Sequence, residues 1–215
     1  MSQAEIQTKL DNRSTGRYLT AYYTREFTAH EFLGEATKRN FPRKISAMDD
    51  ISDVSIIPLT GSRYLKPMRL SYKQSGAARL WDLMRCHDSV AIVIFNTESK
   101  RFIFVQQFRP AVYMSKVGPE LDVGDQVDTD KFPGSLGLTL ELCAGIVDKE
   151  LSLQEIAVEE VREECGYQVS PGKLTKIVTF PSGVGSSGET VTHSAWLYSR
   201  YRRHSDSVQR RGRQQ

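Results

Sequence analysis

The chain has 215 residues, of which 39% are hydrophobic and 26% are charged, and its formal net charge at pH 7 is +3. This composition is ordinary for a soluble domain, and the length suffices to bury one full core. The longest apolar run, residues 90–95, is far shorter than the roughly 18 to 20 residues that a membrane-spanning helix requires. Composition and length therefore predict one domain with appendages and no membrane partner.

The positive charge is concentrated at one end of the chain. Residues 200–215 hold six arginines and one acid, which leaves 23 basic and 25 acidic side chains in the remainder. No aromatic stacking platform or helix pattern accompanies these arginines, so a nucleic-acid partner is not expected. We expect residues 200–215 to form a basic, disordered tail.

The N-terminal segment and the cysteines indicate the cellular compartment in which the protein is expected. The segment lacks an apolar run and has acidic residues among its Arg and Ser residues, which argues against secretory and mitochondrial targeting. The three cysteines, Cys86, Cys143 and Cys165, are odd in number and lack the spacing of metal ligands. Reduced thiols and a cytoplasmic location are therefore expected.

The chain divides at about residue 62. Residues 1–62 are polar with scattered aromatics and no sustained period, which predicts an extension outside the domain, with disorder as an open alternative. Residues 63–199 carry the patterns of a folded domain. The predicted strands are residues 68–72, 78–84, 89–95, 102–106, 138–143, 176–179 and 191–198.

Three connections stand out between these strands. A turn at Gln74-Ser75-Gly76 makes the first two strands a β-hairpin, and a polar loop at residues 96–100 makes the next two a second hairpin. Residues 113–139 are rich in Gly, Asp and Pro and too long for a simple connection, which is typical of a functional or disordered loop. The Gly-rich loop at residues 181–188 joins the last two strands.

The strongest helix signal covers residues 153–165. Ser152 caps its first turn, Glu155 is the capping-box partner three residues later, and Gly166 ends it where a left-handed cap is expected. One face of this helix carries an apolar stripe. The stripe consists of Leu153, Ala157, Val161 and Cys165, extended on one side by Ile156.

Five glutamates also lie within this helix, and their placement predicts a metal site. Glu160 and Glu164 are one turn apart at the edge of the apolar stripe, whereas Glu155, Glu159 and Arg162 point the other way. Two inward carboxylates are costly unless a cation is present, and Mg²⁺ is held by one or two carboxylates plus substrate phosphates. On spacing alone, a solvated acidic face remains the alternative.

The segment from Gly145 to Tyr167 resembles the Nudix box, in which a glycine leads after a spacer into Arg-Glu-apolar-x-Glu-Glu-x-Gly-apolar. Residues 159–167 are Glu-Glu-Val-Arg-Glu-Glu-Cys-Gly-Tyr, so the glycines, three acids and both apolar positions match. The chain is therefore similar to the Nudix hydrolases. The resemblance implies an α/β (α+β) fold, with a mixed sheet sandwiched by helices and an N-terminal β-hairpin region.

Outside the box, from about residue 70 to residue 198, the chain is most similar to the UDP-sugar and ADP-ribose pyrophosphatase branch. The motifs are Gln107-Phe108-Arg109-Pro110, Glu141-Leu142-Cys143-Ala144-Gly145 and an insertion that contains Phe132-Pro133-Gly134-Ser135. The resemblance implies hydrolysis, dependent on Mg²⁺ or Mn²⁺, of a nucleoside-diphosphate sugar. UDP-glucose, giving UMP and glucose 1-phosphate, is favoured by the insertion, while Pro181 is a feature of enzymes that act on ADP-ribose.

The resemblance also implies roles for particular residues. Glu160 and Glu164 are the expected metal ligands, together with the backbone carbonyl of Ala144. Glu163 is the first candidate for activating water, and Glu189 is the second. The residues expected to contact substrate are Arg109 at the phosphates and, on a hairpin that in this branch reaches across a homodimer, Trp81 at the base and Arg85 near the phosphates.

Three features depart from the family pattern. Leu151 occupies the place of the first glutamate of the box, and Glu159 replaces the arginine that orients a neighbouring carboxylate. A catalytically impaired protein that binds a nucleotide or a protein partner is therefore the alternative function. A further strand and a C-terminal helix, which the family has after the strand ending near Tyr198, are expected to be missing, leaving one face of the sheet uncovered.

Overall fold

The computed structural model describes residues 5–11, 18–27, 50–62, 64–118 and 120–199. The helices among them are α2 (Pro110–Val117) and α3 (Leu153–Cys165), with short 3₁₀ turns η1 (Gly134–Gly137) and η2 (Pro171–Lys173). The strands are β1 (Glu5–Asp11), β2 (Tyr18–Phe27), β3 (Lys66–Gln74), β4 (Ala77–Arg85), β5 (Ser89–Asn96), β6 (Arg101–Phe108), β7 (Leu138–Glu141), β8 (Cys143–Ile146), β9 (Thr175–Pro181) and β10 (Thr190–Tyr198). No described helix is long and apolar enough to cross a membrane.

The main sheet is mixed, which confirms the predicted α/β class. Its strand order is β1-β2-β6-β5-β10-β9, and β10 runs parallel to β5 while the other neighbours are antiparallel. The direct pairing of β5 with β6 covers only residues 94–96 and 101–103. Beyond it, β7 pairs with residues 105–108 of β6 and β8 pairs with residues 89–92 of β5. The continuous segment β7–β8 therefore fills a gap where β5 and β6 separate.

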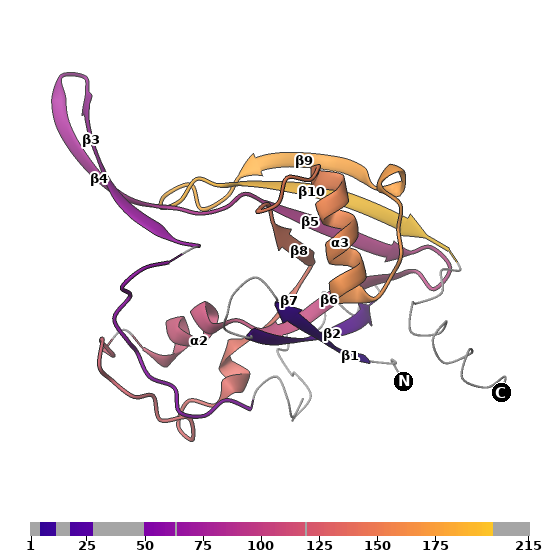
Figure 1. Cartoon of the computed structure of the whole chain (residues 1–215), viewed down its shortest axis with the longest axis horizontal. Coiled ribbons are helices and arrows are strands. Elements are labelled where there is room, and N and C mark those ends of the chain that lie inside the picture. The colour runs from indigo at the N-terminus through magenta and orange to yellow at the C-terminus, as the bar shows by residue number, and fades with distance from the viewer. Residues whose placement is uncertain (1–4, 12–17, 28–49, 63, 119, 200–215) are drawn as a thin grey trace.

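Helix α3 covers one face of this sheet (Figure 1) and begins and ends as its sequence predicts. Ser152 and Glu155 form the expected capping box, and Gly166 adopts the left-handed conformation with φ 72°. Its buried residues pack on apolar side chains of β5, β6 and β10, such as Ile92, Val105 and Trp196. The predicted stripe is wrong at one position, because Leu153 is 38% exposed and the buried face starts at Ile156.

A second apolar cluster lies within the segment that was predicted as a loop. Tyr113 and Val117 of α2 pack with Val127, and Tyr113 donates a hydrogen bond from its hydroxyl to the carbonyl of Phe132. Helix α2 was not predicted. Its signal is Pro110 at the first helical position, where the missing N–H costs no hydrogen bond, but the Gly-, Asp- and Pro-rich sequence that follows masks it.

The predicted hairpin β3–β4 is present and projects from the body of the molecule (Figure 1). Ser75 and Gly76 form its turn with φ values of 52° and 80°, which is the geometry of the turns that join twisted antiparallel strands. Backbone pairing of Met84 with Ser186 joins the base of the hairpin to the loop between β9 and β10. The hairpin thus reaches the main sheet through that loop.

Two strands lie within residues 1–62, the range predicted as an extension. Strand β2 pairs with β6 from Tyr23↔Gln106 to Phe27↔Phe102, and β1 pairs with β2 at the edge of the sheet. These strands were not predicted, because residues 1–62 show no sustained alternation. The predicted basic tail, residues 200–215, lies outside the described residues.

Apolar side chains are exposed on β9 and β10, at the edge of the sheet opposite β1. Val178, Phe180 and Leu197 are 43%, 44% and 66% exposed. Phe180 stacks on His193 across the β9–β10 pair, with ring centroids 5.1 Å apart. The register of this pair, Val191↔Phe180 and His193↔Val178, places these side chains on one face.

The left-handed cap of α3 gives a prediction about stability. Gly166→Ala should lower the free energy of unfolding by about 1 kcal/mol, because a Cβ is strained at a positive φ. Gly172→Ala is the matched control, since Gly172 has no positive φ and no atom within 4 Å of an added Cβ. Denaturant titration would measure both. Equal effects of the two substitutions would contradict the role assigned to Gly166.

Candidate active site

Glu160 and Glu164 are the centre of the candidate site. They follow one another at i and i+4 on α3 and are 6% and 4% exposed, so both carboxylates are inside the protein. Burial of a carboxylate is costly unless hydrogen bonds or a cation compensate for the lost hydration. The solvated acidic face, which spacing alone left open, is therefore excluded for this pair.

The β7–β8 segment holds both carboxylates. The backbone N–H of Ala144 donates a hydrogen bond of 3.1 Å to Oε2 of Glu164. A Cβ added to Gly145 would lie 2.3 Å from Cδ and 2.4 Å from Oε1 of Glu160. A Cβ at residue 145 would therefore force the Glu160 side chain to shift, because that side chain occupies the space next to Gly145.

The carbonyl of Ala144 has a direction that follows from this contact. Ala144 is opposite Ala91 of β5, but its N–H is donated to Glu164 rather than across the strand pair. In an antiparallel ladder both polar groups of such a residue leave the strand on the same edge. The Ala144 carbonyl is therefore expected on the side of the strand where the two carboxylates lie.

The two carboxylates contribute to a shift in the pKa of a neighbouring thiol, that of Cys143. Burial raises the pKa of the Cys143 thiol well above its usual value, and a hydrogen bond with Cys165 raises it further. The negative charges of Glu164 and Glu160 add to the same shift. The Cys143 thiol therefore stays protonated.

This arrangement fits a Mg²⁺ or Mn²⁺ ion that is completed by its substrate. Within the described ranges, no group of three or more His, Cys, Asp or Glu side chains is placed to hold a metal by itself. Two carboxylates and one carbonyl are nonetheless a typical protein contribution to a Mg²⁺ site, since phosphates and water supply the other oxygens. Glu160, Glu164 and Ala144 are the residues that could hold such an ion.

The two candidate bases differ in their surroundings. Glu163 is on α3 with its side chain 28% exposed, and Arg162 lies 3.8 Å from it. Oε2 of Glu189 is buried and has no hydrogen-bond partner in the part of the chain that the structure describes. A buried, unpartnered carboxylate oxygen lacks the donor that such atoms normally have, so Glu189 is the stronger candidate for binding water or substrate.

Asp88 brings the loop of Glu189 to the same end of the sheet as the acidic pair. Its side chain accepts a hydrogen bond of 2.7 Å from the N–H of Thr190, and its carbonyl accepts one of 2.8 Å from Val147. Thr190 directly follows Glu189, and Val147 is two residues after Gly145. Sequence analysis missed Asp88, because a single acid before a strand carries no local signal of a link between two distant segments.

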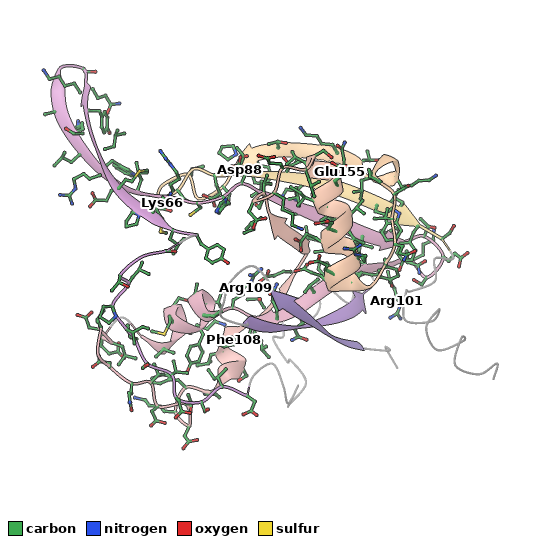
Figure 2. The ribbon with its side chains drawn as sticks, viewed as in Figure 1. Lys66, Asp88, Arg101, Phe108, Arg109 and Glu155 are labelled. Atoms are coloured by element: carbon green, nitrogen blue, oxygen red, sulfur yellow. The ribbon has the colours of Figure 1, made fainter. Side chains whose placement is uncertain are left out.

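Arg109 follows Phe108, the last residue of β6, as predicted (Figure 2). It is held by Glu141, the last residue of β7. Its Nε and Nη2 atoms donate to the two carboxylate oxygens of Glu141 at 2.9 and 2.5 Å. Thr139 and Gln107 donate to the same carboxylate at 2.5 and 3.3 Å. Burial favours the neutral acid, but these hydrogen bonds and the charge of Arg109 outweigh it and lower the pKa of Glu141.

Trp81 and Arg85 lie on β4, the second strand of the projecting hairpin. The indole N–H of Trp81 donates a hydrogen bond of 3.1 Å to the carbonyl of Gly185, and the side chain is 53% exposed. Arg85 is exposed at the base of the hairpin, opposite Lys66. Trp81 is thus not a core residue. Its hydrogen bond to Gly185 places it next to the β9–β10 loop, which also carries Glu189.

Comparison with known proteins identifies the family. The uridine diphosphate glucose pyrophosphatase NUDT14 of Bos taurus is 41% identical over 155 residues, which are 67% of this chain and 69% of the relative. The Mus musculus protein of that name is 41% identical over 158 residues, 68% of this chain and 71% of the relative. The chain belongs to the Nudix family. No family model matches the chain.

A solved structure also resembles this Nudix protein at a greater distance. It is described as an ADP compounds hydrolase and is 15% identical, with a TM-score of 0.45 and coverage of 71% of this chain and 69% of that one.

The two departures from the Nudix box have different structural outcomes. Glu159, in the place of the arginine, forms an ion pair with Lys149 of the preceding loop, and both side chains are about one-third exposed (30% and 31%). This ion pair therefore joins the loop before α3, which carries the lysine, to α3, which carries the acid. Leu151, in the place of the first glutamate, is 39% exposed.

Gly145 gives a prediction about metal binding. Gly145→Ala should displace the Glu160 carboxylate and abolish stabilisation by Mg²⁺, because the new methyl group occupies that position. The melting temperature measured with and without Mg²⁺ reports this effect through ligand linkage. Gly61→Ala is the control, since an added Cβ there meets no atom within 4 Å. Unchanged stabilisation of Gly145→Ala by Mg²⁺ would contradict the site.

Proposed function

We propose that this protein hydrolyses the diphosphate of a nucleoside-diphosphate sugar in a reaction that requires Mg²⁺ or Mn²⁺, with UDP-glucose giving UMP and glucose 1-phosphate. The observation that carries the proposal is the buried pair Glu160 and Glu164, held against Ala144 and Gly145. The names of the two relatives support the choice of UDP-glucose. A cytoplasmic location is part of the proposal, and the three cysteines are free thiols, as that location requires.

Glu160, Glu164 and the Ala144 carbonyl are the proposed metal ligands. When bound there, the metal supplies positive charge that offsets the charge of the phosphates and favours deprotonation of a bound water. The protein contributes the geometry. The Ala144 N–H holds Glu164, and Glu160 lies against Gly145, which supports a proposed site whose two carboxylates are positioned before the substrate arrives.

The chemical step is attack of water on one phosphorus of the diphosphate. Glu189 or Glu163 accepts the proton of the attacking water as its oxygen forms the new P–O bond. The bond from that phosphorus to the bridging oxygen breaks, and the departing phosphate keeps the electron pair and takes up a proton from solvent. The products of UDP-glucose are then UMP and glucose 1-phosphate.

Arg109, Trp81 and Arg85 are the proposed substrate contacts. A guanidinium matches the geometry of a phosphate, which makes Arg109 suited to the diphosphate. Trp81 is half-exposed and is anchored at its N–H, so its ring faces are oriented for stacking on a base. Arg85, four residues before the start of β5, is the proposed second phosphate contact.

A homodimer formed through the hairpin is the proposed assembly. One face of the hairpin carries Met68, Leu70 and Trp81, which are 37%, 50% and 53% exposed. An isolated two-stranded ribbon is marginally stable in water, and an apolar face on it requires a partner. A second copy of the chain, presenting the same face, would bury these side chains.

The metal ligands give a prediction about turnover. Glu160→Gln and Glu164→Gln should each lower Mg²⁺-dependent release of UMP by at least about 100-fold while the fold is retained, because glutamine keeps the shape but removes the charge. Glu155→Gln is the control on the same helix, since Glu155 is exposed and acts in the capping box. A loss of turnover in Glu155→Gln as large as in Glu164→Gln would contradict the proposed site.

The substrate assignment gives a second prediction. With Mg²⁺, the purified protein should hydrolyse UDP-glucose with a higher kcat/KM than ADP-ribose, measured as UMP and AMP released. A reversed order would favour ADP-ribose as substrate. Binding of both nucleotides without turnover would support the catalytically impaired alternative.

The assembly gives a third prediction. Leu70→Ser should convert a dimer into a monomer in sedimentation velocity, because Leu70 lies on the apolar face of the hairpin. Leu80→Ser is the matched control, since Leu80 is 63% exposed but lies opposite Ser71 on the other face. A parent protein that is monomeric at all concentrations would contradict the dimer.

A further inference from the structure

Glu141, the last residue of β7, is held by three different side chains. Both carboxylate oxygens accept hydrogen bonds, from Arg109, Thr139 and Gln107. Its pKa is lowered in spite of burial, so it is ionised at neutral pH. The charge of Glu141 is therefore compensated within the fold, and its stability does not require a metal.

The position of Glu141 relates it to the acidic pair. It is opposite Val105 in the β6–β7 ladder, and Val105 belongs to the core under α3. Cross-strand partners share a face of the sheet, so Glu141 points to the α3 side. Glu141 is three positions before Ala144, a span of at most about 11 Å of extended chain. Glu141 thus fixes Arg109 close to the proposed metal ligands.

The Arg109 side chain would have many conformations without the contact with Glu141. Arg109 follows β6 at the start of a turn into α2, with its side chain 45% exposed, and a solvent-exposed arginine has many rotamers of similar energy. A carboxylate that engages both Nε and Nη2 fixes the plane of the guanidinium as well as its position. Thr139 and Gln107 in turn hold that carboxylate.

We propose that Glu141 is a positioning residue that orients the Arg109 guanidinium toward the diphosphate of the substrate. This inference rests on the proposed function for its substrate. Glu141 acts only through Arg109, so it affects binding of the diphosphate rather than activation of water. Orientation fixed before binding lowers the entropy lost when substrate binds.

Steady-state kinetics with UDP-glucose and Mg²⁺ test the inference. Glu141→Gln should raise KM about tenfold with kcat within about twofold of the parent, since a neutral amide makes weaker hydrogen bonds with a guanidinium. Asp82→Asn is the control: it breaks the Arg69–Asp82 ion pair, which has similar geometry at 2.6 and 2.8 Å but lies on the polar face of the hairpin. It should leave KM unchanged.

A double-mutant cycle separates positioning from a general effect on the fold. Glu141→Ala should raise KM in the parent but not in the Arg109→Ala background, because the residue through which it acts is already absent. The exchange variant with Arg109→Glu and Glu141→Arg re-forms the ion pair and should recover melting temperature but not KM. A rise in KM of equal size in both backgrounds, or recovery of KM by the exchange, would overturn the inference.

Binding of inorganic pyrophosphate in the presence of Mg²⁺, measured by calorimetry, distinguishes failure of this inference from failure of the proposed function. If Glu141→Gln and Arg109→Ala weaken pyrophosphate binding and the double variant is no weaker than Arg109→Ala, the inference is supported even if neither nucleotide sugar is hydrolysed. If UDP-glucose is hydrolysed but Glu141→Gln leaves KM and pyrophosphate binding unchanged, the inference alone is overturned. Absence of both turnover and pyrophosphate binding would overturn both.

Discussion

Two like charges buried one helical turn apart are the constraint on which the rest of this structure depends. Taking a carboxylate out of water costs several kcal/mol even after the protein relaxes, and Glu160 and Glu164 repel one another as well. The Ala144 N–H compensates part of this cost at Glu164. A divalent cation would compensate both charges. The burial of the pair is therefore the main argument for a metal site on α3.

The strand arrangement provides the partner that the pair requires. Because β5 and β6 separate, the β7–β8 segment enters between them and carries Glu141, Ala144 and Gly145 past the inner face of α3. The same segment thus contacts the Arg109 guanidinium at one end and the side chains of Glu160 and Glu164 at the other. One stretch of backbone therefore relates the proposed phosphate contact to the proposed metal ligands.

Local signals account for what the sequence alone could predict. Helix α3 has its cap, its partner acid and its terminal glycine within 15 residues, so each end is determined by neighbours in the sequence. The hairpins follow from alternation and turn residues in the same way. The helical period also placed Glu160 and Glu164 at the edge of the apolar stripe, but spacing alone left a solvated acidic face open, and the packing of α3 on the β7–β8 segment decides for burial.

Contacts between distant segments account for what was missed. Strand β2 is stabilised by pairing with β6, some 80 residues later, and its own sequence shows no sustained alternation. Glu141 meets Arg109 only because two strands are adjacent, and Lys149 meets Glu159 only when the loop packs on the helix. No pattern within a short window indicates either pair. The family resemblance predicted Arg109 as a substrate contact, but it did not predict that Glu141 holds the Arg109 side chain.

Crystals soaked in Mn²⁺ and measured at a wavelength where manganese scatters anomalously would test the central claim most directly. The account predicts an anomalous peak bounded by the carboxylates of Glu160 and Glu164 and the carbonyl of Ala144, and no such peak in Glu164→Gln. A peak confined to other acids, such as Asp122 and Asp125 in the loop after α2, with none beside Glu160, would contradict it.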